Sequence, residues 1–304
     1  MIQSDLCVTI LINNYNYGRF LGHAIDSALN QTYQNVEVIV VDDGSTDESH
    51  DVIRSYGKKI IPILKENGGQ ASAFNAGFAA SHGEIICMLD SDDLFHNCKV
   101  ERVLPYAQQN SLIYHRLQLQ PGLDVIPRKV APRMNFYRHA QRYRFFPYVA
   151  SPTSGLAIGR DLALRLMPLP TQYVRSSADD FIVRGACLLG RVIGIPDVLG
   201  TYRVHGENLW YGKKLPKSAG FMDELERYLN CKLTEAGKKP VIDFYHSIYG
   251  REYIPQRASE LTRLGLSVFK HNPNLVTLKF LLTTIGRAAL RARGRASSEC
   301  AHGN

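Results

Sequence analysis

The sequence predicts an α/β fold in which helices cover both faces of a Rossmann-like sheet. Two observations carry this prediction. Apolar runs rich in β-branched residues alternate with segments of helical period through the first hundred residues. Each run ends at a turn rich in Asp, Asn or Gly, which is typical of parallel strands whose carboxyl ends form one ligand-binding edge.

The first elements follow in order. Apolar residues from Phe20 to Leu29 predict a helix between the first two strands. A second helix is expected to begin at Ser45, because Glu48 would complete a capping box. The small, Ala-rich segment 70–81 leads into the fourth strand. The predicted strands span residues 6–12, 36–41, 60–64 and 84–89.

The pattern changes in the second half. Residues 118–148 are rich in Arg, Pro and Tyr and lack a clear period, which predicts a long, partly irregular basic excursion of the kind that shapes an acceptor cleft. Regular structure is predicted again at residues 151–158. Later elements are expected as a helix at 180–189, short strands at 192–195 and 198–204, and helices at 219–233, 254–270 and 275–295.

Composition limits the class of protein. With 45% hydrophobic and 21% charged residues, the chain can bury a sizeable core. The net charge of +8 suits anionic partners such as sugar nucleotides, nucleic acid or acidic lipids, without choosing among them. Six cysteines without a CxxC pair, and an N-terminus without signal-peptide features, predict a cytoplasmic protein. No apolar stretch reaches the roughly 18 residues of a membrane span.

Two acidic turns stand at predicted strand ends. The carboxylates of Asp90-Ser91-Asp92-Asp93 suit Mg²⁺ or Mn²⁺, which can neutralise a departing diphosphate. A solvated turn that caps the next helix explains the same residues. In Asp42-Asp43-Gly44-Ser45, one carboxylate can accept from a pyrimidine N–H or a ribose hydroxyl, although an Asx turn would use it too. Tyr15, after the first strand, offers a ring for base stacking.

Four longer strings make a resemblance specific. They are ILINNYNYGRFLGHAIDSALNQTY, VEVIVVDDGSTDES, ENGGQASAFNAGFAASHGE and ICMLDSDDLF. In order and spacing they resemble the nucleotide-binding half of the family-2 glycosyltransferases, and the resemblance extends over about residues 6–208. It implies a GT-A fold, which is a mixed sheet flanked by helices, a uridine diphosphate type of donor and inversion at the anomeric carbon. No G-x-G-x-x-G follows the first strand, which argues against a dinucleotide-dependent oxidoreductase.

The resemblance also implies roles for single residues of the first half. Tyr15 would stack on the base and Asp43 would bind its uracil-like edge. Asp90 would lie near the ribose. Asp92, together with Asp93, would hold the metal and the diphosphate.

Two motifs of the second half match the same family. Asp179-Asp180, followed by Arg184, resembles the family's Glu-Asp motif and places Asp180 at the catalytic base, whereas an Asp pair at a helix start is also a common cap. The string Tyr202 to Asn208 resembles the closing motif, with His205 as a metal or phosphate contact and Arg203 near the diphosphate. Ser154 and Gly155 look like the acceptor-side loop, which a simple turn explains nearly as well.

Two basic segments bear on the choice between a nucleic-acid partner and a membrane partner. No recognisable nucleic-acid fold surrounds the arginines of 118–148, so we predict no nucleic-acid partner. The segment 275–295 combines apolar residues with arginines. This composition is shared by helices that lie on anionic membranes and by ordinary terminal helices.

We therefore predict a GT-A catalytic domain at 1–210, with a nucleotide-sugar-binding half at 1–115 and an acceptor half at 116–210. A helical, membrane-associating region follows at 211–304. The predicted activity is a hexosyltransferase-type, metal-assisted transfer to a glycan or lipid-linked hydroxyl in polysaccharide biosynthesis, in the cytoplasm or at the inner membrane face. The alternative is a catalytically silent sugar-nucleotide-binding protein of the same fold.

Overall fold

In the computed structural model, the described residues are 6–130, 134–172, 174–208 and 218–244, with isolated positions at 211, 247 and between 266 and 283. The chain divides into two compact units. One comprises Met1–Arg133 with Tyr148–Leu215, and the other Met134–Pro147 with Pro216–Asn304.

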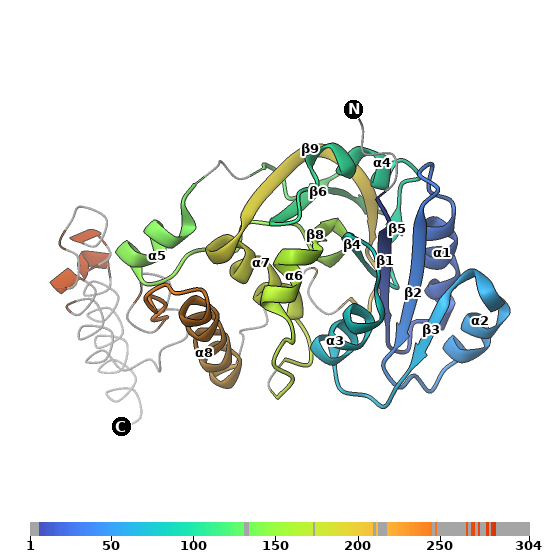
Figure 1. Cartoon of the computed structure of the whole chain (residues 1–304), viewed down its shortest axis with the longest axis horizontal. Coiled ribbons are helices and arrows are strands. Elements are labelled where there is room, and N and C mark those ends of the chain that lie inside the picture. Colours follow the sequence, from blue (N-terminus) through green and yellow to red (C-terminus); the bar gives the residue numbers. More distant parts are fainter. Residues whose placement is uncertain are drawn as a thin grey trace, which may run out of the picture. The chain divides into compact units, whose positions relative to one another are not determined.

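A mixed sheet forms the centre of the first unit (Figure 1). Its main path runs β3-β2-β1-β4-β8-β6-β9-β5, with β7 paired to β6. The first four strands of this path are parallel, β8 is antiparallel to β4 and β6, β9 runs parallel to β6, and β5 is antiparallel to β9. The strands are β1 Val8–Asn14, β2 Val36–Asp42, β3 Ile61–Leu64, β4 Ile85–Asp90, β5 Leu94–Phe95, β6 Ser111–Gln120, β7 Val125–Ile126, β8 Leu156–Gly159 and β9 Arg191–Arg203.

Helices flank this sheet, as the sequence predicts. The α-helices of the first unit are α1 Gly18–Leu29, α2 Ser49–Ser55, α3 Gln70–Ala80, α4 Lys99–Val103, α6 Arg160–Leu166 and α7 Ala178–Leu189. Short 3-10 turns occur at η1 Gly57–Lys59, η2 Leu104–Tyr106 and η3 Thr153–Gly155. Among the described helices, none combines the length and the apolar character needed to cross a bilayer.

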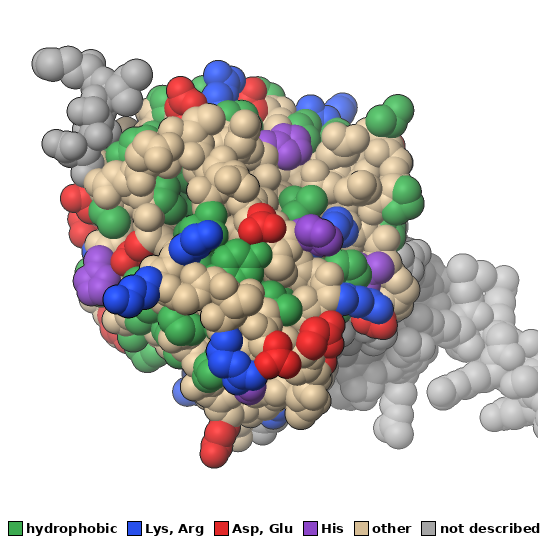
Figure 2. Space-filling view, turned by 90° about the vertical axis from the view of Figure 1, so that its right-hand side faces the viewer, with side chains coloured by type: hydrophobic (Ala, Val, Ile, Leu, Met, Phe, Trp, Pro, Cys, Tyr) green, Lys and Arg blue, Asp and Glu red, His purple; other side chains and the backbone are tan. Residues whose placement is uncertain are grey.

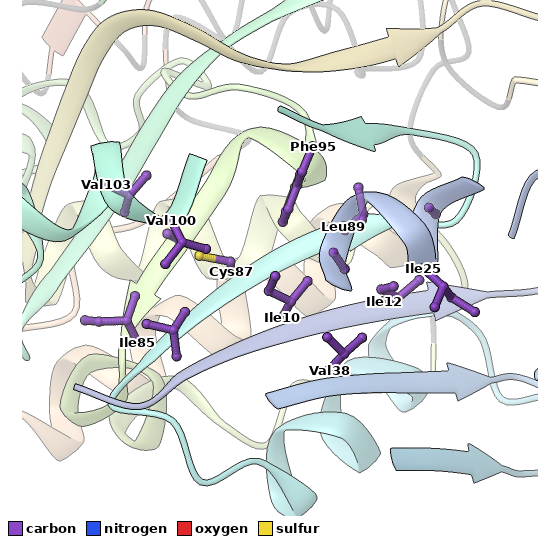
Figure 3. Close-up of a cluster of buried hydrophobic side chains, with 14 of the residues drawn as sticks. Ile10, Ile12, Ile25, Val38, Ile85, Cys87, Leu89, Phe95, Val100 and Val103 are labelled. Atoms are coloured by element: carbon purple, nitrogen blue, oxygen red, sulfur yellow. The ribbon is translucent and has the colours of Figure 1, made fainter. Parts of the chain in front are cut away.

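The alternation of side chains along β1 builds a core on each face of the sheet. Ile10 and Ile12 join a fully buried apolar cluster with Ile25 of α1 (Figure 3). Leu11 points the other way and packs beneath Gly77 of α3. On the face of the first unit seen in Figure 2, basic and acidic side chains are interspersed, and apolar ones gather only in small groups. The apolar packing on both faces of β1 fixes the strand ends that carry the polar turns.

The second unit contains α5 Phe136–Tyr143 and α8 Ala219–Glu235. Phe145 stacks on Phe146, with ring centroids 5.9 Å apart, and meets the edge of Phe244 at 5.0 Å. The Asp243 amide donates to the Arg144 carbonyl at 2.8 Å, which joins the two stretches of chain that form this unit.

Two local predictions are wrong. The second helix begins at Ser49 instead of Ser45, because Ser45 bonds to Asp42 rather than capping a helix. The two short strands at 192–195 and 198–204 are one continuous strand, β9. The stretch 118–148 contains the end of β6, the short strand β7 and the helix α5, with irregular chain between them. The helices predicted at 254–270 and 275–295 fall almost entirely outside the described residues.

We expect Gly77→Ala to destabilise the protein. A Cβ at this position would lie 2.2 Å from the Leu11 Cδ1 and 2.9 Å from the Val41 Cγ2, and both neighbours are buried. Overpacking of this kind lowers the free energy of unfolding by about 1–3 kcal/mol, measured by urea unfolding. The matched control is Gly22→Ala in α1, where the nearest atom is 3.5 Å away and no loss is expected. Equal effects of the two substitutions would contradict the packing described.

Candidate functional site

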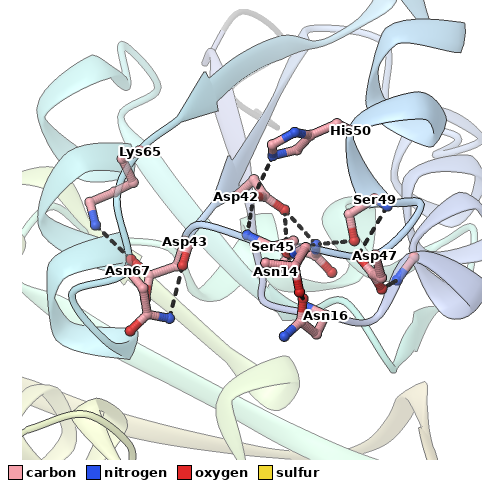
Figure 4. A network of polar contacts seen from close by, with 12 residues as sticks. Asn14, Asn16, Asp42, Asp43, Ser45, Asp47, Ser49, His50, Lys65 and Asn67 are labelled. Atoms are coloured by element: carbon pink, nitrogen blue, oxygen red, sulfur yellow. Dashed lines mark hydrogen bonds and ion pairs between the residues drawn. The ribbon is translucent and has the colours of Figure 1, made fainter.

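The turn after β2 is organised by a buried aspartate. Asp42 Oδ2 accepts hydrogen bonds from Asn14 Nδ2 and Ser45 Oγ, both at 2.7 Å (Figure 4). Its Oδ1 accepts from the Ser45 amide at 2.8 Å and lies 3.0 Å from His50 Nε2. Asp42 therefore holds the turn together and sets the direction of the next residue, Asp43.

Asp43 faces a glycine turn on the neighbouring segment. Its Oδ1 accepts from Lys65 Nζ at 2.6 Å and from the Gly68 amide at 3.0 Å. Its Oδ2 accepts from the Gly69 amide at 2.6 Å. Gly69 has a φ of +86°, and a Cβ there would lie 2.6 Å from the Arg175 Cα, so a side chain is excluded. Three of the roughly four acceptor positions of this carboxylate are thus occupied.

Asp90, Asp92 and Asp93 form the acid loop, which follows β4. Each offers a carboxylate oxygen, and these oxygens lie within 4.8 Å of one another. Burial raises the pKa of Asp90 to about 7, and the charge of Asp92 adds to the rise. Burial and the two neighbouring carboxylates also hold the pKa of Asp93 well above its usual range. A divalent cation would relieve this repulsion, and the hard oxygen donors fit Mg²⁺ or Mn²⁺.

His205 joins the acid loop from far along the chain. Its Nε2 lies 3.1 Å from Asp92 Oδ2, and its ring packs on Phe20 with centroids 4.6 Å apart. Asn208 also reaches Asp92, through Nδ2 at 3.5 Å. The structure thus brings together the two residues that the sequence predicted as a metal-binding pair.

Arg203 and Asp93 clamp the acid loop. The guanidinium of Arg203 donates to the carbonyl of Asp92, to that of Phe20 at 3.2 Å and to that of Ser91 at 3.3 Å. It also lies over the Phe20 ring. Asp93 is fully buried, and its Oδ1 accepts from the Arg203 amide at 3.0 Å. The charge of Arg203 therefore lies beside the loop while its donors hold the loop backbone.

Gln70, which the sequence analysis did not single out, bridges two parts of the site. Its Oε1 accepts from the Ala178 amide, the first of α7, at 2.9 Å. Its Nε2 makes a longer contact with Asp90 Oδ1 at 3.5 Å. The only signal in the sequence is a polar residue at a helix start after two glycines.

The first turn of α7 carries the predicted base. Asp180 is 2% exposed, and its Oδ1 accepts from Arg184 Nε at 2.6 Å. Asp179 is half-buried and accepts from the Tyr148 hydroxyl at 3.0 Å. The charge of Asp179 contributes to the raised pKa of Asp90, so α7 and the acid loop share one electrostatic environment.

The remaining predicted residues differ in accessibility. Tyr15 follows β1 directly and is 49% exposed, which leaves its ring available to a ligand. Ser154 and Gly155 lie in the buried turn η3 instead of on an open surface. Ser154 Oγ donates to Asp93 Oδ2 at 2.6 Å, so this turn supports the acid loop. The sequence did not predict that Lys99 is fully buried, because its neighbours in the chain resemble an ordinary surface helix.

Comparisons with known proteins identify the family and the fold. The family model described as glycosyl transferase family 2 matches residues 9–164. An uncharacterized glycosyltransferase of Nostoc sp. is 32% identical over 272 residues, which cover 83% of each chain. One from Rickettsia typhi is 40% identical over 136 residues, or 45% of this chain and 42% of the relative. The structure of S. aureus TarS 1-349 in complex with UDP-GlcNAc has a TM-score of 0.57 at 15% identity and covers 93% of this chain and 80% of that one. The fold is GT-A, as predicted.

We expect Arg203→Met to lower the free energy of unfolding by about 1–3 kcal/mol, because several carbonyls would lose a charged donor. The measurement is urea unfolding. The matched control is Arg19→Met, since Arg19 covers the same Phe20 ring and its ion pair with Glu207 is exposed. This control should stay within about 0.5 kcal/mol of the unaltered protein. An effect of the control as large as that of R203M would argue against the clamp.

Proposed function

Because this chain belongs to glycosyl transferase family 2, we propose that it transfers a sugar from a uridine diphosphate donor to a hydroxyl of a glycan or lipid-linked acceptor. The proposed transfer inverts the anomeric carbon and is assisted by Mn²⁺ or Mg²⁺. The supporting observation is the carboxylate cluster of the acid loop, with His205 3.1 Å from Asp92, at the edge where parallel strands end.

The choice of uridine follows from the hydrogen bonds of Asp43. Lys65, Gly68 and Gly69 occupy three of its acceptor positions, which leaves about one for a ligand. A uracil edge presents one N–H between two carbonyls and matches this arrangement. A guanine edge presents an N–H next to an amino group and needs two acceptors. Tyr15 would stack on the base.

Asp92 and His205 would hold the cation, and Asp90 would lie near the ribose. Bound there, Mn²⁺ or Mg²⁺ supplies positive charge against the charge that develops on the leaving diphosphate. Both oxygens of Asp93 accept hydrogen bonds from the protein, so its role as a further ligand is secondary to its role in holding the loop. Arg203 adds positive charge beside the same loop.

Asp180 is the proposed base. The acceptor oxygen attacks the anomeric carbon, its proton passes to the Asp180 carboxylate, and the bond to the diphosphate breaks. Arg184 orients this carboxylate through its hydrogen bond from Nε. Asp179, bonded to Tyr148 and half-buried, would face the acceptor.

Membrane association rests on the sequence of 275–295, whose arginines and apolar residues suit an anionic lipid surface. This segment would bring the active site close to a lipid-linked acceptor.

We expect the protein to bind UDP with Mn²⁺ and to release UDP from UDP-sugars in preference to GDP from GDP-sugars, measured by calorimetry and nucleotide release. Asp92→Asn should weaken Mn²⁺ binding at least about tenfold, because a charged ligand is lost. The control is Asp51→Asn, an exposed residue of α2 that forms an ion pair with Arg54 on the same helix. Donor binding without nucleotide release, for every acceptor class tried, would favour the silent binding protein.

We expect Asp180→Asn to reduce kcat by roughly 10²–10⁴-fold while leaving donor affinity unchanged, because the base would be lost and the donor pocket kept. Asp161→Asn is the matched control and should retain full activity, since Asp161 is an exposed acid in the first turn of α6. Arg184 would lose its charged partner, so unfolding midpoints are measured alongside, and Asp180→Glu tests the base in a variant that keeps the charge. Full turnover in a folded D180N protein would remove Asp180 from this role.

A further inference from the structure

A fully buried polar cluster lies beneath the acid loop. Ser154 Oγ donates to Asp93 Oδ2 at 2.6 Å and accepts from the Asp90 amide at 3.1 Å. Lys99 Nζ, at the start of α4, donates to the Ser154 carbonyl at 3.2 Å. Ser154, Asp93 and Lys99 are all 0% exposed. One hydroxyl therefore joins the two ends of the acid loop from a segment 64 residues away from Asp90.

Lys99 is an unusual residue to bury. Lysine side chains are almost never fully buried unless they are paired, because the ammonium loses its hydration. Here burial lowers the pKa of Lys99 to about 7. Its described contacts are the Ser154 carbonyl and the Phe95 ring, 3.3 Å from Nζ to the ring centroid. A hydrophobic residue of similar length would avoid the cost of burying this group, but it could not donate the hydrogen bond to Ser154.

We propose that Ser154 is a positioning residue, whose hydroxyl sets the spacing between Asp90 and Asp93 so that Asp92 faces the cation, and that Lys99 holds the Ser154 peptide in place. This inference rests on the proposed function, in which the acid loop binds a divalent cation. It also replaces the expectation that Ser154 contacts the acceptor.

The mechanism of positioning is steric and electrostatic. Asp93 is buried next to two other carboxylates, and its only described donors are Ser154 Oγ and the Arg203 amide. If the Ser154 hydroxyl is removed, one oxygen of the buried Asp93 carboxylate loses its donor. We expect the carboxylate to rotate toward another donor and the loop backbone to shift with it. The distance between Asp92 and His205 then changes, whereas Asp43 keeps its separate donors, Lys65 and the glycine amides.

The chain offers a matched control three residues away. Ser151 is also 0% exposed, and its hydroxyl has no hydrogen-bond partner among the described residues. Ser154→Ala and Ser151→Ala therefore remove the same atom at the same burial, from the same stretch of chain. They differ in the contacts to Asp90 and Asp93.

We expect S154A to weaken Mn²⁺ binding about tenfold, because a hydrogen bond to a buried carboxylate is lost, and S151A to leave it unchanged. Calorimetry on the full chain measures Mn²⁺ binding, and UDP binding without metal should be unaltered in both variants. Lys99→Met provides a second variant. It should weaken Mn²⁺ binding while the unfolding midpoint stays equal or rises, since removing a buried charge does not destabilise by itself.

Three outcomes would overturn the inference. Equal Mn²⁺ affinities of S154A and S151A would remove Ser154 from positioning and leave the proposed function intact. An unchanged Mn²⁺ affinity in K99M would show that Lys99 is not needed to hold the Ser154 peptide. Failure of the unaltered protein to bind Mn²⁺ would overturn the cation site together with this inference.

Discussion

The site depends on holding several carboxylates close together at one buried edge of the sheet. Burial, and after it the repulsion between neighbouring carboxylates, raises the pKa values of Asp90 and Asp93. The fold counters it with fixed donors from outside the loop. Asn13, Ser154 and Arg203 each donate to the loop. Because these donors come from distant segments, the cluster exists only in the folded chain.

Two adjacent asparagines at the end of β1 each donate a hydrogen bond to one of the acidic turns. Neighbouring residues of a strand point to opposite faces, so Asn13 and Asn14 serve different aspartates. In the parallel register, Asn13 pairs with Asp90 of β4 and Asn14 with Asp42 of β2. Asn13 Nδ2 donates to Asp90 at 2.6 Å, and Asn14 Nδ2 donates to Asp42 at 2.7 Å. The central strand thus ties both acidic turns to one edge.

The start of α3 connects the acid turns to the helix that carries Asp180. The Gly69 amide donates to Asp43, while the side chain of Gln70 contacts Asp90 and accepts from the first amide of α7. The Gln70 amide also donates to the Arg175 carbonyl at 3.0 Å. One short stretch therefore contacts the nucleotide side, the acid loop and α7. A movement of Asp43, the acid loop or α7 would therefore change the contacts that this stretch makes with the other two.

The sequence by itself determined the parallel strands β1 to β4, their common edge and the family motifs, because burial period and turn chemistry are local properties. Only the tertiary structure decided how far each aspartate is enclosed. Asp42 and Asp43 are both buried and accept hydrogen bonds from other segments, whereas Asp93 is buried and its neighbour Asp92 stays partly exposed. The sequence shows only adjacent acids. It also decided that β9 is one strand beside β6, that Gln70 contacts Asp90 and α7, and that Lys99 and Ser154 lie beneath the acid loop. These outcomes depend on contacts between residues far apart in the chain, and no local pattern encodes such partners.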